Sequence, residues 1–558
     1  MVRPDHLALV SGHNSNEAAL AAGKGVGGMS IRCEADRGTA AWAYSKKTQV
    51  AALGWLLLWG IALTLASAPA QAEWIEASSD HFVIYSEQDA ETVRRFSERL
   101  ELFHASMAFV FPRQQVKPSP SNRVTIFVVS NAREVRRMAK VGNNVLGVYR
   151  PRAGQSVAMV PTIRTGGSKY DLSSEEVLYH EYAHHVMWGV INRTFPRWYI
   201  EGFAETFAGV TFQEDVVALG APAHHRSAGL VYGPNVRIQD LLNVDGGLSR
   251  GQEDVFYGKA WTLFHYLMFD PDRSGQLTKY EQRLAAGDGA LQAAETAFGS
   301  LNQLQRDMND YVGRRSLRGF SIPKKNLPIG PIVVRKLPAG EAAIMPTRMQ
   351  SRMGIDAEKE AQPLVEEARR VAALYPTDPA VLTALAEAEF DAGNADAAIA
   401  AADRALAIDP KQMNAYVQKG FAIEHKIRTG ALPKESWKEL RAHWAKANRA
   451  ENNHPLPLQG YYLTYLDEGL EPTPNAVKGL EWALALAPFD PSLRWTVAQQ
   501  MVNDDRLTDA ARTLGPLAYT PHPSESSEQA RQLLAEIEAK LAARSAEAAE
   551  ATSSRGAE

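Results

Sequence analysis

The chain has 558 residues, a formal net charge of −4 and an isoelectric point near 6.4. This length leaves room for more than one domain. The slight acidity, and the lack of a basic stripe with interleaved aromatic residues, argue against nucleic acid as a partner. Cys33 is the only cysteine, which excludes an intramolecular disulfide, so we expect a hydrophobic core to hold the protein together.

The first 72 residues predict a targeting segment. Residues 1–45 show no clear periodicity and form an N-terminal extension that could lie outside the translated protein, with Met29 as an alternative start. Lys46 and Lys47 then precede an apolar run over 50–66 and an Ala-x-Ala site that ends at Ala72. This order predicts a signal peptide over 46–72, and hence an exported, periplasmic protein in a bacterium. The alternative is an uncleaved segment that anchors the protein in the membrane.

After residue 73 the pattern is typical of an α+β domain. Runs rich in β-branched and aromatic residues predict strands over 81–85 and 123–129, and helical periodicity predicts a helix over 91–110 between them. Two more strands are expected over 145–149 and 156–160.

A His-Glu-x-x-His pattern follows this predicted sheet. Ser173 and Glu176 form a capping-box pattern, which predicts that a helix begins here. On that helix His180 and His184 lie four residues apart and project from one face, where two imidazoles can bind one zinc ion. Glu181, next to the first histidine, can reach a water on the metal.

A catalytic zinc normally has three protein ligands, so the chain must supply another one downstream. Glu201 is the candidate, in a short second helix that follows Pro196. Glu205 lies one turn further along the same helix. We expect its carboxylate to accept the outer N–H of a zinc-bound histidine and so to fix that ring.

These two motifs, HEYAH and WYIEGFAE, resemble those of the gluzincin metallopeptidases, and more closely those of bacterial peptidase-MA-like domains. The resemblance covers about residues 73–320 and implies a thermolysin-like α+β fold. It implies His180, His184 and Glu201 as Zn²⁺ ligands and Glu181 as the general base. In such domains an edge strand pairs with the extended substrate, and we expect 156–160 to be that strand.

A helix predicted after residue 256 carries a further candidate. By analogy with such peptidases, Tyr257 could stabilise the oxyanion; the alternative is an aromatic core residue. His265 is a weaker rival for this role, because it lies on an apolar face, where a buried structural histidine is more usual. His185 and the pair His224–His225 have no matching spacing and are taken as bystanders.

A calcium-loop template is also satisfied from Asp270 to Glu281. A polar helix–loop–helix turn explains the same residues, so this loop is not included in the expected site.

The last third of the chain predicts helical repeats. Residues 321–355 are expected to form a linker; its part over 321–350 is rich in Pro, Gly and Lys and could contain a short strand pair. Beyond it Pro376 and Pro410 lie 34 residues apart, the tetratricopeptide period, with weaker equivalents at Pro455, Pro488 and Pro521. We expect an all-α tetratricopeptide-type solenoid over 356–541 whose groove binds a protein partner. A fraying or disordered tail is expected over 542–558.

The sequence therefore favours an exported zinc peptidase that hydrolyses peptide bonds through a zinc-activated water, with the repeats binding substrate or partner. The alternative is a partner-binding scaffold whose zinc site is structural or vestigial. Substrate identity, and endopeptidase versus exopeptidase action, stay open at this point.

Overall fold

The computed structural model describes residues 73–112, 116–142, 145–162, 170, 172–190, 195–243, 252–520 and 524–555. The expected extension over 1–45 and the expected signal segment over 46–72 lie outside these residues. Within the described part of the chain, no helix combines the length and the apolarity that a membrane span requires.

A mixed six-stranded sheet forms the centre of the N-terminal region. Its strand order is β4-β5-β3-β2-β1-β9, in which β2, β3 and β5 are mutually parallel and the other pairs are antiparallel. Both β2 and β3 are buried at every residue, because they lie inside the sheet and both faces are covered. The strands are β1 (Ile75–Ser78), β2 (Phe82–Ser86), β3 (Val124–Val129), β4 (Val148–Arg150), β5 (Val157–Pro161) and β9 (Val333–Lys336).

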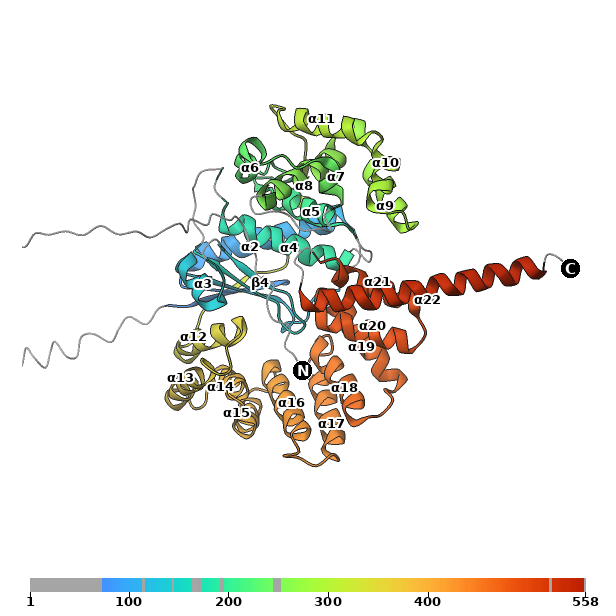
Figure 1. Cartoon of the computed structure of the whole chain (residues 1–558). Helices are drawn as coiled ribbons and strands as arrows, with labels where there is room; N and C mark the ends of the chain where they lie inside the picture. Colours follow the sequence, from blue (N-terminus) through green and yellow to red (C-terminus); the bar gives the residue numbers. More distant parts are fainter. Residues whose placement is uncertain are drawn as a thin grey trace, which may run out of the picture. The chain divides into compact units, whose positions relative to one another are not determined.

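Alternate residues of these strands enter two separate cores. Phe82, Ile84 and Ile126 pack with side chains of α2 (Ala90–Val110) and α4 (Ser174–Val190). Val83 and Phe127 point to the other face, where α3 (Ala132–Ala139) and α12 (Ala339–Met353) cover them. The predicted α+β architecture is confirmed, and Figure 1 shows α2 and α4 lying together along the sheet.

The expected edge strand is wrong. β5, which corresponds to 156–160, lies between β3 and β4, and the two edge strands of the sheet are β4 and β9. β4 and β5 form a hairpin whose turn contains Gly154 at φ 76° and Gln155 at φ 143°. The sequence marked both strands but gave no signal for which of them lies outside.

The expected linker over 321–355 belongs instead to the folded N-terminal region. β8 (Phe320–Pro323) pairs with β7 (Val216–Leu219), which pairs with β6 (Val210–Phe212) in a second sheet. β9 completes the main sheet, and α12 follows it. Met345, Met349 and Met353 recur every four residues on α12 and are buried against that sheet. An amphipathic helix was therefore hidden in a stretch rich in Pro and Gly.

Helices α5 and α8 pack against each other, and α5 packs against α4, the helix that carries the His-Glu-x-x-His motif. Gly202 of α5 permits the close approach of α8, since a Cβ there would lie 2.5 Å from the Ala260 carbonyl oxygen. The remaining elements of this region are α5 (Arg197–Ala208), η1 (His224–Arg226), α6 (Ser227–Tyr232), α7 (Ile238–Leu242), α8 (Gln252–Phe269), η2 (Pro271–Arg273), α9 (Gln276–Ala285), α10 (Ala290–Phe298), α11 (Leu301–Val312) and η3 (Lys324–Asn326).

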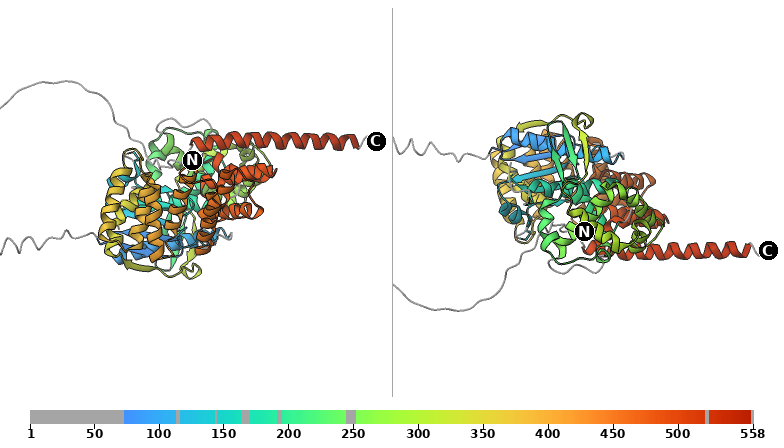
Figure 2. Two further views of the ribbon diagram at one scale, coloured as in Figure 1. Left: turned by 90° about the horizontal axis from the view of Figure 1, so that it is seen from below. Right: turned by 90° about the horizontal axis from the view of Figure 1, so that it is seen from above.

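The C-terminal region is an all-helical solenoid of tetratricopeptide type, as predicted. Successive helices pack as neighbours, and Asp378 and Asp490 cap helices that begin with proline. The helices are α13 (Ala361–Leu374), α14 (Pro379–Asp391), α15 (Ala395–Ile408), α16 (Met413–Arg428), α17 (Ser436–Ala450), α18 (Pro455–Glu468), α19 (Pro474–Leu486), α20 (Pro491–Asn503), α21 (Leu507–Ala518) and α22 (Glu525–Arg555). Residues 542–555 of the expected tail continue α22 as helix. The first part of α22 packs on α21, and its C-terminal part extends away from α20 and α21 in Figures 1 and 2.

The solenoid packs against the N-terminal region of its own chain. Phe489 stacks on His185 of α4 with ring centroids 4.1 Å apart, and Asp490 accepts a 2.6 Å hydrogen bond from the Ala153 N–H. Glu451 accepts hydrogen bonds from the backbone and the hydroxyl of Ser121. Side chains of α14 and α16 line a cavity of about 220 Å³ together with β2 and α12. Part of the repeat surface therefore contacts this chain itself, and His185, taken as a bystander, lies at that contact.

Candidate functional site

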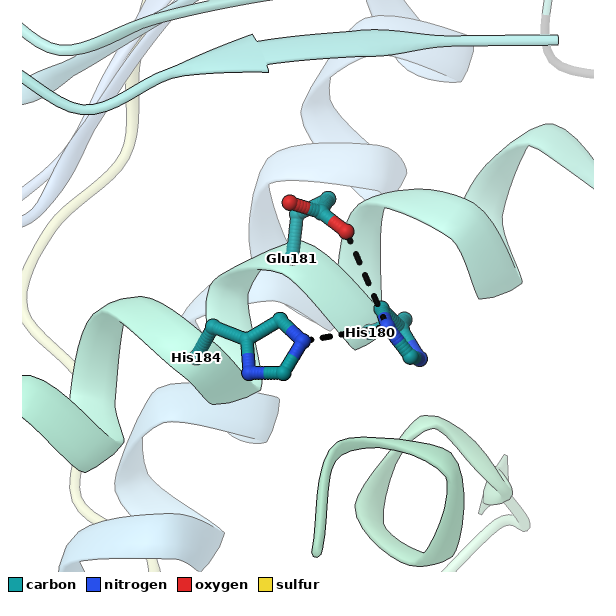
Figure 3. A group of neighbouring side chains, drawn as sticks. All are labelled: His180, Glu181 and His184. Atoms are coloured by element: carbon teal, nitrogen blue, oxygen red, sulfur yellow. Dashed lines mark hydrogen bonds and ion pairs between the residues drawn. The ribbon is translucent and has the colours of Figure 1, made fainter. Parts of the chain in front are cut away.

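The motif helix α4 begins with the predicted capping box. The Glu176 N–H donates to Ser173 Oγ at 3.1 Å, and the Ser173 N–H donates to the Glu176 carboxylate at 2.8 Å. Buried residues before and within the motif, Leu178 and Tyr182 among them, fix the helix against the sheet and α2. Figure 3 shows the result: His180 and His184 turn toward each other, and Glu181 lies beside His180.

Three donor atoms converge between α4 and α5. His180 Nε2 lies 3.1 Å from His184 Nε2, and Glu201 Oε2 lies 3.3 Å and 3.5 Å from the same two nitrogens. All three side chains are buried, Glu201 completely. The structure thus brings together the three residues proposed as ligands, which come from two helices separated by a loop.

The spacing of these atoms fits one zinc ion. A tetrahedral site with metal–ligand bonds of about 2.05 Å has edges about 1.63 times as long, or about 3.3 Å. The three measured separations lie at or near this edge length. In the described part of the chain Glu201 Oε1 and His184 Nδ1 have no hydrogen-bond partner, and Glu201 Oε2 faces only the two imidazole nitrogens. A buried carboxylate with so few partners is costly, and a cation held between these atoms would lower that cost.

The pKa values around this point also favour a positive charge. Burial by itself lowers the pKa of His180, but its interactions with Glu201 and Glu205 outweigh burial and raise the pKa to about 10. Burial raises the pKa of Glu201, but the two imidazoles outweigh it and hold that pKa well below its usual range. A proton or a metal cation can supply the positive charge that these groups stabilise.

Glu181 lies beside the same donor atoms, but its carboxylate is farther from them than that of Glu201 is. Its Oε1 is 3.7 Å from His180 Nε2, and this buried oxygen has no hydrogen-bond partner among the described residues. Burial is the main cause that raises its pKa above the ordinary value for glutamate. A carboxylate with a raised pKa and a free oxygen beside the donor cluster has the properties of a general base.

Glu205 lies behind His180, on the side away from the donor cluster. Its Oε1 is 3.3 Å from His180 Nδ1, so the ring faces the cluster with Nε2 and the carboxylate with Nδ1. This is the arrangement expected of a carboxylate that orients a metal-binding histidine.

Two further residues that the sequence analysis missed hold Glu205 in place. Arg226 Nη2 donates to Glu205 Oε1 at 2.6 Å, and His225 Nε2 lies 3.2 Å from Glu205 Oε2. His225, expected to be a bystander, instead contacts the carboxylate of Glu205. It reaches the site because the strands β6 and β7 return the chain to α5, and no spacing rule in the sequence reports such a return.

Tyr257 on α8 is also at the site. Its ring lies edge-on to His180 with centroids 6.3 Å apart, and it is largely buried, with Arg226 4.8 Å and Arg197 5.8 Å from its centroid. Burial raises its pKa well above the ordinary value, so its hydroxyl keeps its proton and can donate a hydrogen bond.

The two other motifs take structural roles. His265 bonds the Tyr311 hydroxyl at 2.7 Å and the Gly220 carbonyl at 2.8 Å, as expected for a buried structural histidine. In the calcium template, Asp270 pairs with Arg314 and Glu281 accepts from the Tyr199 hydroxyl, so the first and last ligand positions have other partners. His180, Glu181 and His184 each place one ligand atom within 4.8 Å of the other two, and all three side chains are buried.

Comparisons with known proteins add little to this geometry. A scan against protein-family models finds no match, and a search of curated proteins finds none either. Among solved structures, the chain is similar to a thermophilic TPR protein of Thermus thermophilus, with 19% identity, a TM-score of 0.29, and coverage of 36% of this chain and 98% of that one. It is similar to PilF of Pseudomonas aeruginosa, with 15% identity, a TM-score of 0.29, and coverage of 36% and 90%. For yeast Tom70 the identity is 13%, the TM-score 0.26, and the coverage 57% and 70%. At these values the similarities carry no argument about function, and the description of the repeats depends on their own helix pairing.

Proposed function

We propose that this chain is an exported zinc-dependent peptidase of the gluzincin type, with a thermolysin-like catalytic region and a helical-repeat region that packs on it. The observation that carries the proposal is the convergence of His180 Nε2, His184 Nε2 and Glu201 Oε2 at tetrahedral spacing. Export depends on the signal segment over 46–72, which the sequence alone supports.

The residues divide the chemistry among them. His180, His184 and Glu201 would hold Zn²⁺, and a bound Zn²⁺ would supply Lewis-acid polarisation of the substrate carbonyl and of water. Glu181 takes a proton from the attacking water and passes it to the leaving amine, for which its free oxygen is suited. Tyr257, which keeps its proton, donates a hydrogen bond to the oxygen on which negative charge develops.

Metal content and hydrolysis together test this proposal. We expect one zinc per chain in the purified protein by elemental analysis, and loss of that zinc in His184→Ala. Glu181→Gln should keep the zinc and lose cleavage of a peptide library. A Glu181→Gln protein that retains both zinc and the full hydrolytic rate would contradict the assigned base.

A partner-binding scaffold is the second candidate. Its support is the repeat array itself and the large apolar side chains that α18, α19 and their connection expose: Leu466 is 44% exposed, Leu470 47% and Trp482 43%. Such a surface suits a protein partner. Zinc binding without hydrolysis of any library peptide, in wild type and Glu181→Gln alike, would favour the scaffold.

A further inference from the structure

Arg226 occupies a central position behind the donor cluster. It is 7% exposed, and its guanidinium bridges two helices: Nη2 donates to Glu205 of α5 and Nη1 donates to Asp254 of α8, at 2.6 Å and 2.7 Å. A planar guanidinium fixes the direction of both bonds, which a single ammonium group cannot do.

The same side chain contacts the second group at the site. The guanidinium carbon lies 4.8 Å from the Tyr257 ring centroid, and that ring meets His180 edge-on. Arg226 therefore contacts a carboxylate and an aromatic ring that both adjoin His180, and it comes from η1, outside the two motifs.

The charge at Glu205 requires such a partner. Glu205 is 2% exposed and lies near the carboxylates of Glu201 and Glu181, so an uncompensated negative charge here would be strongly unfavourable. With Arg226 and His225 each beside one oxygen, the carboxylate has one orientation in which Oε1 also meets His180 Nδ1.

We propose that Arg226 is the positioning residue of this site: it fixes Glu205 and the Tyr257 ring, and through Glu205 it sets the orientation in which His180 presents Nε2 to a metal. This inference rests on the proposed zinc site and extends it to a residue that binds neither metal nor substrate.

The test compares three variants of the full chain by zinc dissociation constant, measured in competition with a chromophoric chelator. We expect Arg226→Gln to weaken zinc binding by about 10–100-fold, the usual effect of losing a residue that orients a metal ligand. Arg226→Lys should also weaken it, because an ammonium cannot bridge Glu205 and Asp254. Arg273→Gln is the matched control: it removes a guanidinium that also lies over a tyrosine ring of α8 and pairs with a carboxylate, but at Tyr266 and Asp307, nine residues further along the helix than Tyr257, so zinc binding should stay at the wild-type level.

A crystal structure of metal-free Arg226→Gln gives a second readout that does not depend on zinc. We expect Glu205 to move away from His180 Nδ1. An unmoved Glu205 together with unchanged zinc affinity would overturn the proposal, as would complete rescue by Arg226→Lys, which would reduce the role to charge. If the wild-type protein binds no zinc, the proposed function is wrong. The position of Glu205 in the Arg226→Gln crystal still shows whether Arg226 positions that carboxylate.

If Arg226→Gln does not fold, a milder variant tests the same bridge. Asp254→Asn removes the charge of the outer partner and leaves Arg226 in place. We expect weaker zinc binding than in wild type with a smaller change than in Arg226→Lys, and an unchanged affinity would count against the bridge.

Discussion

The N-terminal region and the helical repeats differ in the kinds of side chain that they bury. Between α4 and α5 the protein buries imidazoles and carboxylates, and several of their polar atoms have no hydrogen-bond partner within the described ranges. The first repeats instead bury small side chains, which let paired helices approach closely: Ala384, Ala388, Ala398, Ala401, Ala402 and Ala405. One interior has the features of a reactive site, and the other those of a stable support.

This difference has an energetic meaning. Buried charges are costly unless each one is paired. The residues of the site therefore add little stability of their own, and the surrounding structure must supply it. Repeat arrays gain stability from similar contacts between neighbouring units. Phe489 packs on His185, one residue after His184, so the repeats meet the motif helix directly and can stabilise it.

The largest expected effect is at Trp444 in the repeats. This fully buried side chain of α17 lies between Gly420 of α16 and Gly460 of α18. Trp444→Ala should lower the free energy of unfolding by about 3–5 kcal/mol, since it leaves a large cavity. Urea titration measures the loss. If the two regions have separate roles, the variant should still bind zinc at low temperature, where it stays folded. Loss of zinc binding together with the loss of stability would show that the two roles are not separable.

A pair of glycine substitutions sharpens the comparison. A Cβ on Gly202 would lie 2.5 Å from the Ala260 carbonyl oxygen, and one on Gly420 would lie 2.2 Å from Trp444. Each change to alanine should cost about 1–3 kcal/mol through overpacking. Only Gly202→Ala should also weaken zinc binding, because it displaces the helix that carries Glu201. Equal zinc affinity in both variants would contradict this division.

A smaller effect of opposite sign is expected at Glu181. Burial is the largest cause of the raised pKa of this carboxylate, whose Oε1 has no hydrogen-bond partner in the described region, so its replacement removes the cost of burying a charge. Glu181→Gln should stabilise the metal-free protein by about 0.5–2 kcal/mol while hydrolysis is lost. Thermal unfolding after chelation measures this gain. A less stable variant would mean that the carboxylate supports the fold.

The last effect concerns the acid sensitivity of the contact between the two regions. Burial, with Arg352 acting in the same direction and Glu451 opposing, lowers the pKa of His454 from 6.5 to about 4. Between these values the unfolded chain binds a proton that the folded chain does not. The contribution of His454 to the free energy of unfolding is therefore fully present above about pH 6.5 and is lost as the pH falls toward 4.

The corresponding measurement is the thermal midpoint of wild type and His454→Gln at about pH 7.5 and about pH 5. We expect the drop on acidification to be smaller in the variant, which cannot take up that proton. Equal drops in the two proteins would exclude His454 as a contributor.

The sequence by itself determined the features that depend on local spacing. A helix places residues four apart on one face, so the His180–His184 pair and the Glu201–Glu205 pair could be read directly, as could the capping box at Ser173. The repeat solenoid followed from a 34-residue period for the same reason, because each unit specifies its own helix pair.

Only the tertiary structure decided the features that depend on distant segments meeting. Strand order placed β4, not β5, at an edge of the sheet, the segment expected to be a linker completed the sheet with β9, and Phe489 reached the motif helix. His225 and Arg226 reached Glu205 through a return of the chain. Contacts of this kind come from the packing of whole elements, whose relative placement no local spacing encodes.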